Sequence, residues 1–461
     1  MKNMIQYTEN KMRKESFMSK KKLTVGIATL GCKVNQYESE AIAERLEALG
    51  FEISDADKPC DAYIINTCTV TAESDRKARQ TIRRMMKHNP EAYILVTGCY
   101  SQVSPEDVAA ISGVDYICGS SNKMSVCDKL TELYERGKKN ASPEICVPDL
   151  DSSNFEPMSI RRFERTRAYV KIEDGCESKC AYCTIPASRG PIRSKPFDQV
   201  IREVKEITDG GCSEIVLTGI ETGSYGRDLP EKESFGSLLS AVDKIEGIKR
   251  VRLGSLDPTV IKPEFVEKIK DLKSLAPHFH LSLQSGSSKT LAAMRRKYNA
   301  DQAMASIERL RAVLPDVKFT TDIIVGFPGE SEEDFEASCD FARRARFLMI
   351  HVFPYSKRKG TIAATMKEQI PEAVKKERVH RLTEISQQIR SEILNEKIAE
   401  SKKVSVLFES CENGYAKGHT ADFIEVKVKT NKKLHGVFRD VTLISHDGNV
   451  CEAEFADFDK E

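Results

Sequence analysis

The sequence has little that would place the protein in a membrane or outside the cell. No stretch approaches the roughly 18 consecutive apolar residues of a membrane span, and the N-terminus lacks the apolar centre of a signal peptide. We therefore expect a cytoplasmic protein with no membrane partner. The formal net charge of the 461 residues is only +1, so overall charge does not favour nucleic-acid binding. Disulfides are not expected among the 14 cysteines, because a reducing compartment favours metal ligation or catalysis.

The chain is long enough for about three domains. Residues 1–21 are polar and lysine-rich, and we expect a mobile leader there. From residue 22 to about 145, strand and helix patterns alternate. This alternation predicts an α/β fold with a parallel sheet, most simply a flavodoxin-like domain.

Three cysteines of this domain share one kind of position. Cys32, Cys68 and Cys99 each lie just past the carboxyl end of a predicted strand. Those ends converge on one crevice in an open parallel sheet, so the three side chains can meet and hold a metal cluster. Three separate buried thiols remain the alternative, since free cysteine is often buried.

The rest of the chain reads as a linker, a partial barrel and a small β-domain. Pro148 and Pro157 mark a linker over 146–160. Six strand patterns with helices between them then predict a partial (β/α)6 barrel over 161–395, including a long trailing helix from about 371. Short alternating strands over 396–461 predict a small antiparallel β-barrel of the oligonucleotide-binding kind. The pattern alone leaves RNA binding by this last domain open.

The most informative residues are Cys176, Cys180 and Cys183, which follow the first predicted barrel strand. Three thiolates at this spacing can hold three irons of a [4Fe–4S] cluster and leave the fourth iron free for a ligand. The alternatives are a structural zinc knuckle or cysteines of an ordinary core. Zinc sites usually have four closed ligands, and no fourth Cys or His follows within a short loop.

The spacing of these cysteines, with Tyr182 between the second and third, resembles the signature of radical S-adenosylmethionine enzymes. Further motifs resemble the methylthiotransferases of that superfamily. They run in order along the chain over 29–39, 66–70, 97–102, 174–194, 217–220, 280–287, 322–330 and 353–361. The first motif and the stretch Leu217 to Gly226 most resemble the MtaB-type branch, which modifies threonylcarbamoyladenosine in tRNA. Other branches act on isopentenyl-adenosine in tRNA or on an aspartate of a ribosomal protein.

The resemblance implies a reaction with two [4Fe–4S] clusters and S-adenosylmethionine. Cys176, Cys180 and Cys183 would hold the radical-generating cluster, and Cys32, Cys68 and Cys99 an auxiliary cluster that delivers sulfur. Other residues in the matching motifs would contact the cofactor: Tyr182, Gly219, Glu221 and Gln284. No side chain is expected to act as a catalytic acid or base, because an aromatic C–H lacks usable acidity.

The resemblance also implies a tRNA partner, held by a C-terminal module called TRAM over 396–461. The basic runs at 295–297 and 357–359 would be phosphate contacts, although a solvated face is the ordinary alternative. An electron donor and a sulfur donor are required, and neither is identified by the sequence. A non-catalytic RNA-binding iron–sulfur protein is the alternative from a different class.

Two positions depart from the family pattern. Glu177 stands where relatives usually carry Asn, and Glu221 where the MtaB-type phrase usually has His. Glu177 would lower the cluster potential if it pointed inward, but a solvent-facing side chain is the simpler expectation. Glu221 could contact the amino group of S-adenosylmethionine. The eight cysteines outside the two trios fit no spacing rule and are expected as small hydrophobic residues.

Overall fold

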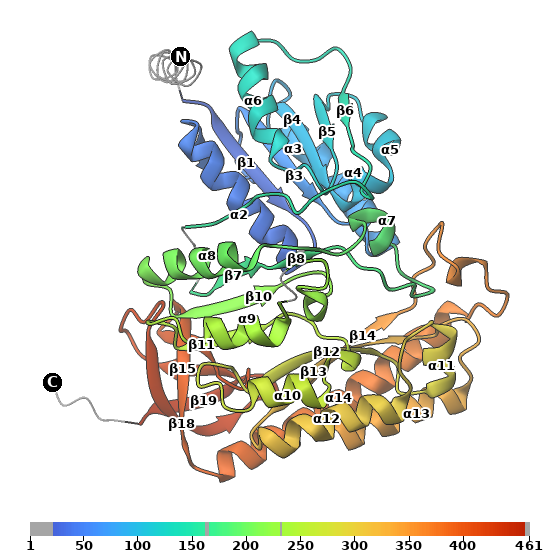
Figure 1. Cartoon of the computed structure of the whole chain (residues 1–461), viewed down its shortest axis with the longest axis vertical. Helices are drawn as coiled ribbons and strands as arrows, with labels where there is room; N and C mark the ends of the chain where they lie inside the picture. Colours follow the sequence, from blue (N-terminus) through green and yellow to red (C-terminus); the bar gives the residue numbers. More distant parts are fainter. Residues whose placement is uncertain (1–21, 162–165, 231–232, 457–461) are drawn as a thin grey trace. The chain divides into compact units, whose positions relative to one another are not determined.

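The computed structural model describes residues 22–161, 166–230 and 233–456 (Figure 1). The leader predicted at 1–21 lies outside these residues. The chain divides into two compact units. The first unit comprises Met1–Ile160 and Thr184–Pro191, and the second comprises Arg161–Cys183 and Ile192–Glu461. The short segment directly after Cys183 therefore belongs to the first unit.

The first unit is a six-stranded parallel sheet in the order β2-β1-β3-β4-β5-β6. Its strands are β1 (Thr24–Thr29), β2 (Glu52–Ser54), β3 (Ala62–Thr67), β4 (Tyr93–Gly98), β5 (Tyr116–Cys118) and β6 (Glu144–Cys146). Its helices are α2 (Lys33–Ala48), α3 (Ala72–His88), α4 (Cys99–Val103), α5 (Pro105–Ala109), α6 (Ser125–Arg136) and α7 (Ile185–Arg189). The 2-1-3-4-5 order is that of flavodoxin-like folds, so the predicted fold class is confirmed.

Hydrophobic cores lie on both faces of this sheet. Every residue of the central strand β3 is buried, as expected for a parallel strand covered by helices on both sides. Residues 147–160, predicted as a linker, contain no helix or strand. Met158 and Ile160 are nevertheless buried, and the Tyr37 hydroxyl donates a hydrogen bond to the Met158 carbonyl at 2.9 Å. This segment therefore packs within the first unit.

The second unit begins with six parallel strands that form a partial barrel (Figure 1). Two three-stranded sheets, β11-β10-β7 and β12-β13-β14, are joined by single bridges from Val251 to Leu275 and from Leu256 to Leu281. The six strands are β7 (Ala168–Lys171), β10 (Glu214–Thr218), β11 (Arg250–Leu253), β12 (His278–Gln284), β13 (Lys318–Val325) and β14 (Met349–Pro354). A short ribbon pairs β8 (Glu173–Asp174) with β9 (Arg193–Ser194). The predicted (β/α)6 architecture is confirmed.

Helices follow each barrel strand and pack around it. They are α8 (Phe197–Asp209), α9 (Phe235–Val242), α10 (Pro263–Ile269), α11 (Ser288–Ala293), α12 (Ala300–Val313) and α13 (Glu332–Ala345), with short turns η1 (Thr222–Ser224), η2 (Pro258–Val260) and η3 (Ala363–Thr365). Capping fixes their starts: Ser331 and Asp334 form a reciprocal capping box at α13. The long helix α14 (Glu372–Ala399) packs against β14 and α13.

The C-terminal domain is a closed five-stranded barrel. Its strands are β15 (Lys403–Glu412), β16 (Tyr415–Thr420), β17 (Glu425–Lys429), β18 (Phe438–His446) and β19 (Cys451–Phe455). The predicted small β-barrel is confirmed, with one difference: β17 and β19 pair in parallel, although every other neighbouring pair is antiparallel.

This small barrel contacts the amino end of the partial barrel through a buried ionic network. The Glu214 carboxylate pairs with Arg167 at 3.0 Å, Arg250 at 3.0 Å and Arg252 at 2.8 Å. Arg250 and Arg252 also donate hydrogen bonds to backbone carbonyls of β15, of the last residue of β16 and of the residue after it. Burial opposes ionisation of Glu214, but the charges of Arg252, Arg167 and Arg250 outweigh it and lower the pKa of this carboxyl. The network joins the two barrels into one unit.

Within the described residues, no helix has the length and apolar character needed to cross a membrane.

Candidate functional site

The structure places the first cysteine trio at the carboxyl edge of the parallel sheet. Cys32 precedes α2, Cys68 follows β3, and Cys99 is the first residue of α4 after β4. Gly31, with φ +102°, lies against Cys68, since a Cβ there would come within 2.8 Å of the Cys68 Cβ. Only glycine tolerates both this backbone conformation and this approach.

The three thiols are close enough to influence one another's ionisation. Burial raises the pKa of the Cys68 thiol, and negative charge on Cys99 and Cys32 raises it further. Three neighbouring thiolates therefore need a bound cation or cluster to balance their charge. Cys32 is exposed, whereas Cys68 and Cys99 are buried, so the trio opens to one side.

Arg189 supplies a positive charge beside this trio. Its Nε donates a hydrogen bond to the Cys99 Sγ at 3.1 Å, and its Nη1 bonds the Glu38 carboxylate at 2.6 Å. The residue ends α7, in the short segment after Cys183 that belongs to the first unit. Arg189, Glu38 and Lys123 all have fully buried side chains. Lys123 also pairs with Glu38 and donates to the Asn66 amide oxygen at 2.8 Å.

The second cysteine trio lies on the loop that follows β8. A tight turn shapes this loop, because the Ser178 N–H points to the Cys176 Sγ at 3.4 Å and the Cys183 N–H donates to the Cys180 carbonyl at 3.2 Å. The Ala181 N–H donates to the Met294 carbonyl, which ties the loop to the segment after β12. The loop is therefore held at the carboxyl ends of the barrel strands, where such barrels carry their chemistry.

A charged side chain contacts each of two cysteines in this trio. The Cys176 thiol donates to the Glu221 carboxylate at 3.1 Å. The Arg296 Nη1 donates to the Cys180 Sγ at 3.3 Å, and its Nη2 pairs with Asp257 at 2.6 Å. Both trios thus have one sulfur that accepts a hydrogen bond from an arginine. Such bonds to cluster sulfurs tune reduction potential.

The predicted cofactor contacts lie on the cysteine loop, in the segment after β10 and at the end of β12. Gly219 follows β10 and lies against the Glu173 side chain, so that a Cβ would come within 2.6 Å of the Glu173 Oε2. The Glu221 N–H donates to the same oxygen at 2.8 Å. Gln284 ends β12 at a positive φ of 71°, next to a register shift. The Tyr182 ring meets Phe327 edge-on, with 6.4 Å between centroids.

The side chains at both trios fit the [4Fe–4S] clusters and the polar cofactor that the sequence implies. Each trio supplies three free thiols, which suits a cluster of several irons with one iron left open better than a zinc ion, which usually has four closed ligands. Buried oxygens near Glu221 also lack hydrogen-bond partners among the residues that the structure describes: Glu173 Oε1, Thr222 Oγ1 and Ser224 Oγ. Unpaired buried polar atoms usually indicate an unseen ligand or water. A polar cofactor bound beside Glu221 would satisfy them.

The predicted phosphate contacts are only partly free to bind RNA. Arg296 is buried against Cys180 and Asp257 and therefore cannot be a surface contact, which corrects that expectation. Arg358 is also buried. Glu177 is exposed, which agrees with the simpler expectation of a solvent-facing side chain.

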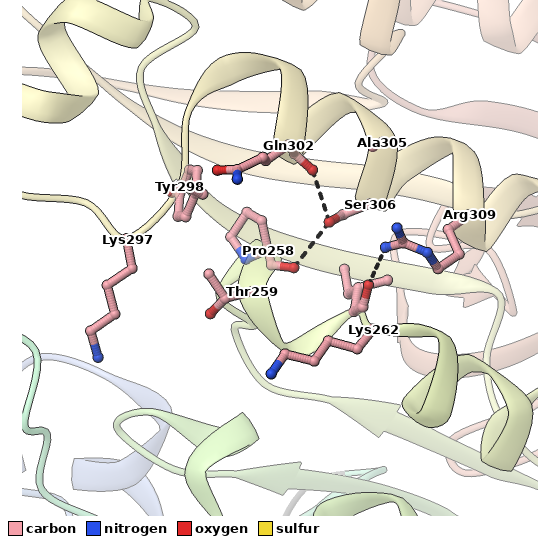
Figure 2. Close-up of a pocket in the computed structure, with 10 residues that line it drawn as sticks. Pro258, Thr259, Lys262, Lys297, Tyr298, Gln302, Ala305, Ser306 and Arg309 are labelled. Atoms are coloured by element: carbon pink, nitrogen blue, oxygen red, sulfur yellow. Dashed lines mark hydrogen bonds between the residues drawn. The ribbon is translucent and has the colours of Figure 1, made fainter.

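Lys297 lines a cleft of about 260 Å³ together with Lys262 (Figure 2). Figure 2 shows α12 forming one wall, where Ser306 and Arg309 donate hydrogen bonds to the carbonyls of Pro258 and Ile261. Neither lysine forms an ion pair among the described residues. The cleft therefore offers two positive charges without an ion-pair partner among the described residues, and one of them, Lys297, follows Arg296 directly in the chain.

The sequence predictions missed the roles of two residues: Arg189 was not singled out, and Arg296 was expected as a phosphate contact. Arg189 and Arg296 each lie in a stretch whose importance the sequence indicated, after Cys183 and after Gln284 respectively. Because Arg189 and Arg296 are far in sequence from Cys99 and Cys180, their contacts with these cysteines could not be predicted from the sequence. All 14 cysteines are free thiols, so disulfides play no part in the fold.

Two family models match the chain. The Radical SAM superfamily matches residues 170–342, and the Uncharacterized protein family UPF0004 matches residues 24–119. Each match contains one cysteine trio.

Curated relatives match nearly the whole chain. Threonylcarbamoyladenosine tRNA methylthiotransferase MtaB of Bacillus subtilis is 38% identical and covers 94% of this chain and 96% of its own. The protein of the same name from Aquifex aeolicus is 34% identical, with 90% and 99% coverage. A tRNA-2-methylthio-N(6)-dimethylallyladenosine synthase of Thermoanaerobacter pseudethanolicus is 35% identical, with 97% and 95% coverage.

Among solved structures, the radical S-adenosylmethionine methyltransferase TsrM of Kitasatospora setae, with cobalamin and a [4Fe–4S] cluster bound, is similar. It is 14% identical, with a TM-score of 0.55, and covers 75% of this chain and 77% of its own. This likeness concerns the fold alone. Identity above 30% over nearly the full length of several relatives is decisive, and the chain belongs to the methylthiotransferase family of radical S-adenosylmethionine enzymes.

Proposed function

We propose that the protein is a tRNA methylthiotransferase that converts N6-threonylcarbamoyladenosine next to the anticodon into its 2-methylthio derivative. The observation that carries this proposal is the presence of two separate cysteine trios, one in each unit, each with an arginine bonded to one sulfur. A single trio would support radical chemistry without a sulfur source. The relatives named MtaB support the choice of nucleoside.

The residues of each site have distinct roles in this proposal. Cys176, Cys180 and Cys183 hold the cluster that works with S-adenosylmethionine, and Cys32, Cys68 and Cys99 hold the auxiliary cluster. When bound, these groups supply a hydrogen-abstracting radical and sulfur for the adenine ring.

The protein's own side chains orient and balance those groups. Glu221, beside Cys176, would accept a hydrogen bond from the amino group of S-adenosylmethionine. Gly219 leaves room for the Glu173 side chain beside the Glu221 backbone, and Gln284 and Tyr182 would line the same end of the barrel. Arg189 and Arg296 stabilise thiolate charge through their hydrogen bonds to Cys99 and Cys180.

Transfer RNA is the partner, and two surfaces support its binding. Lys262 and Lys297 in the cleft of Figure 2 provide positive charge for phosphates close to the Arg296 loop. The C-terminal β-barrel has the architecture of small RNA-binding barrels. Catalysis also needs a one-electron reductant and a sulfur donor as partners. Because tRNA is modified where it is used, we place the reaction in the cytoplasm.

A second substrate is favoured by one comparison. The Thermoanaerobacter relative named for dimethylallyladenosine is 35% identical over 97% of this chain, close to the identity of the MtaB relatives. Isopentenyl-adenosine in tRNA is therefore the competing substrate.

The deciding experiment compares tRNA nucleosides by mass spectrometry in a strain that lacks the gene and in the same strain complemented with it. We expect 2-methylthio-threonylcarbamoyladenosine to vanish and return. If that nucleoside persists while 2-methylthio-isopentenyl-adenosine disappears, the substrate assignment is wrong. Complementation with Cys176→Ala should restore neither nucleoside.

A further inference from the structure

Three side chains of the kinds that bind metals, none of them a cysteine of either trio, lie on β12, β13 and β14. His280 is on β12, Asp322 on β13 and His351 on β14. The strand register places His280 opposite Thr320 and Asp322 opposite His351. Residues in register on parallel strands project from the same face of the sheet. The three side chains therefore share one face.

This face is the inner face of the partial barrel. The alternate residues of the three strands are buried on the opposite, helix-covered face: Phe279, Leu281, Phe319, Ile323 and Ile350. By contrast, the His280 and Asp322 side chains keep 19% and 30% of their surface exposed, and His351 is exposed. Solvent or a ligand in the barrel interior can thus reach all three.

The three side chains are close enough to bind one ion. One ligand atom from each lies within 4.8 Å of the other two, and the His280 Nε2 is 3.3 Å from the Asp322 Oδ2. Two imidazoles and one carboxylate on one face form a ligand set that suits divalent transition metals and leaves coordination positions open.

The surroundings of His280 favour metal binding through Nε2. Its Nδ1 is 2.9 Å from the Thr320 Oγ1, which is in turn 3.0 Å from the His278 Nε2. When His280 Nδ1–H donates to Thr320, the Nε2 lone pair faces the Asp322 carboxylate. A cation between them would relieve the repulsion between this lone pair and the carboxylate. A hydrogen bond from the second ring nitrogen is the usual support of a metal-binding histidine.

The geometry points to a mononuclear divalent transition-metal site formed by His280, Asp322 and His351, in addition to the two clusters. Its open positions face the barrel interior and accept oxygen donors. Under the proposed function, which this step requires, the threonyl group supplies a carboxylate and a hydroxyl that can chelate such an ion. An isopentenyl group has neither, so the metal would also select between the two substrates.

The test uses the full chain with both clusters assembled. The protein is equilibrated with zinc alone, passed through a desalting column and assayed for iron and zinc per chain. We expect wild type to retain one more zinc than His280→Gln and His351→Gln, at equal iron content. His380→Gln is the matched control, because His380 is an exposed histidine on α14, paired with Glu384 at 3.6 Å. It should match wild type.

X-ray absorption at the zinc edge supplies a second measurement. A nitrogen and oxygen shell with imidazole scattering supports the site, whereas a shell of sulfur alone overturns it. Equal zinc in wild type and both variants, at full iron loading, also overturns it. If zinc binds but does not strengthen the affinity for a threonylcarbamoyl-modified stem-loop, the chelation of the threonyl group is wrong and the metal site itself is supported. Failure of the proposed function in the nucleoside assay would not change the zinc count.

Discussion

Replacing Arg189 with methionine should destabilise the first unit strongly. The substitution keeps side-chain bulk but removes the hydrogen bonds to Cys99 and Glu38 inside a region with no solvent access. Removing one partner of a buried ion pair typically costs about 3–5 kcal/mol. Lys123 still pairs with Glu38, so we expect a loss near the lower end, about 3 kcal/mol.

Hydrogen exchange of the cluster-free full chain, read by mass spectrometry, measures this loss. Peptides from β3 should exchange roughly 100-fold faster, because each 1.4 kcal/mol is about a factor of ten. Peptides from α14 in the second unit are the internal control. Arg189→Lys should lose less stability than Arg189→Met, since lysine keeps the positive charge but not the forked guanidinium geometry.

Arg45→Met is the matched surface variant. Its Asp128 pair leaves 45% and 67% of the two side chains exposed, so it should cost about 0.5 kcal/mol. Exchange of β3 in Arg189→Met within twofold of Arg45→Met would refute a stabilising role for the buried network.

Three further predictions concern the other sites. The two barrels of the second unit should separate at acid pH. The lowered pKa of Glu214 stabilises the fold above the ordinary glutamate pKa near 4.3, and this stabilisation is lost as pH falls through the lower folded pKa. Limited proteolysis between α14 and β15 would detect the separation, and Glu214→Gln should show it already at pH 7; resistance of Glu214→Gln would contradict the network's role. Lys262→Ala and Lys297→Ala should each reduce the steepness of the plot of log affinity for tRNA against log salt concentration by about 1. Lys205 is exposed, and Lys205→Ala is the control that should leave the slope unchanged. Equal slopes in all three variants would exclude the cleft as an RNA contact. Arg296→Met should lower the reduction potential of the radical cluster relative to wild type, because a positively charged hydrogen-bond donor to Cys180 is lost. A redox titration monitored by electron paramagnetic resonance measures this potential. An unchanged potential at full iron loading would show that this hydrogen bond does not tune the cluster.

The sequence predicted the strands of both α/β regions well because they are strongly patterned. One of the six predicted barrel strands covers residues 318–325, the same bounds as β13. Short or edge strands such as β2 and β6 were missed, since three residues carry almost no periodic signal. The parallel pairing of β17 with β19 could not be predicted either, because strand direction in a small barrel depends on closure rather than on local pattern.

The positions of the cysteine trios followed from topology, but their neighbours did not. A residue just past a parallel strand must lie at the carboxyl edge of the sheet, so Cys32, Cys68 and Cys99 could be grouped without a structure. Arg189 reaches Cys99 only because the segment after Cys183 folds with the first unit. Arg296 looked like part of a surface basic run and is instead buried. Such contacts depend on tertiary packing, which adjacent sequence does not encode.

The most direct test of the two-site account is the iron content and chemistry of a variant in which Cys32, Cys68 and Cys99 are all replaced with Ala. After anaerobic reconstitution, we predict about half of the wild-type iron, continued reductive cleavage of S-adenosylmethionine to 5′-deoxyadenosine, and no methylthiolated tRNA. Full iron content in this variant, or normal methylthiolation, would show that these three cysteines are ordinary thiols and would contradict the account.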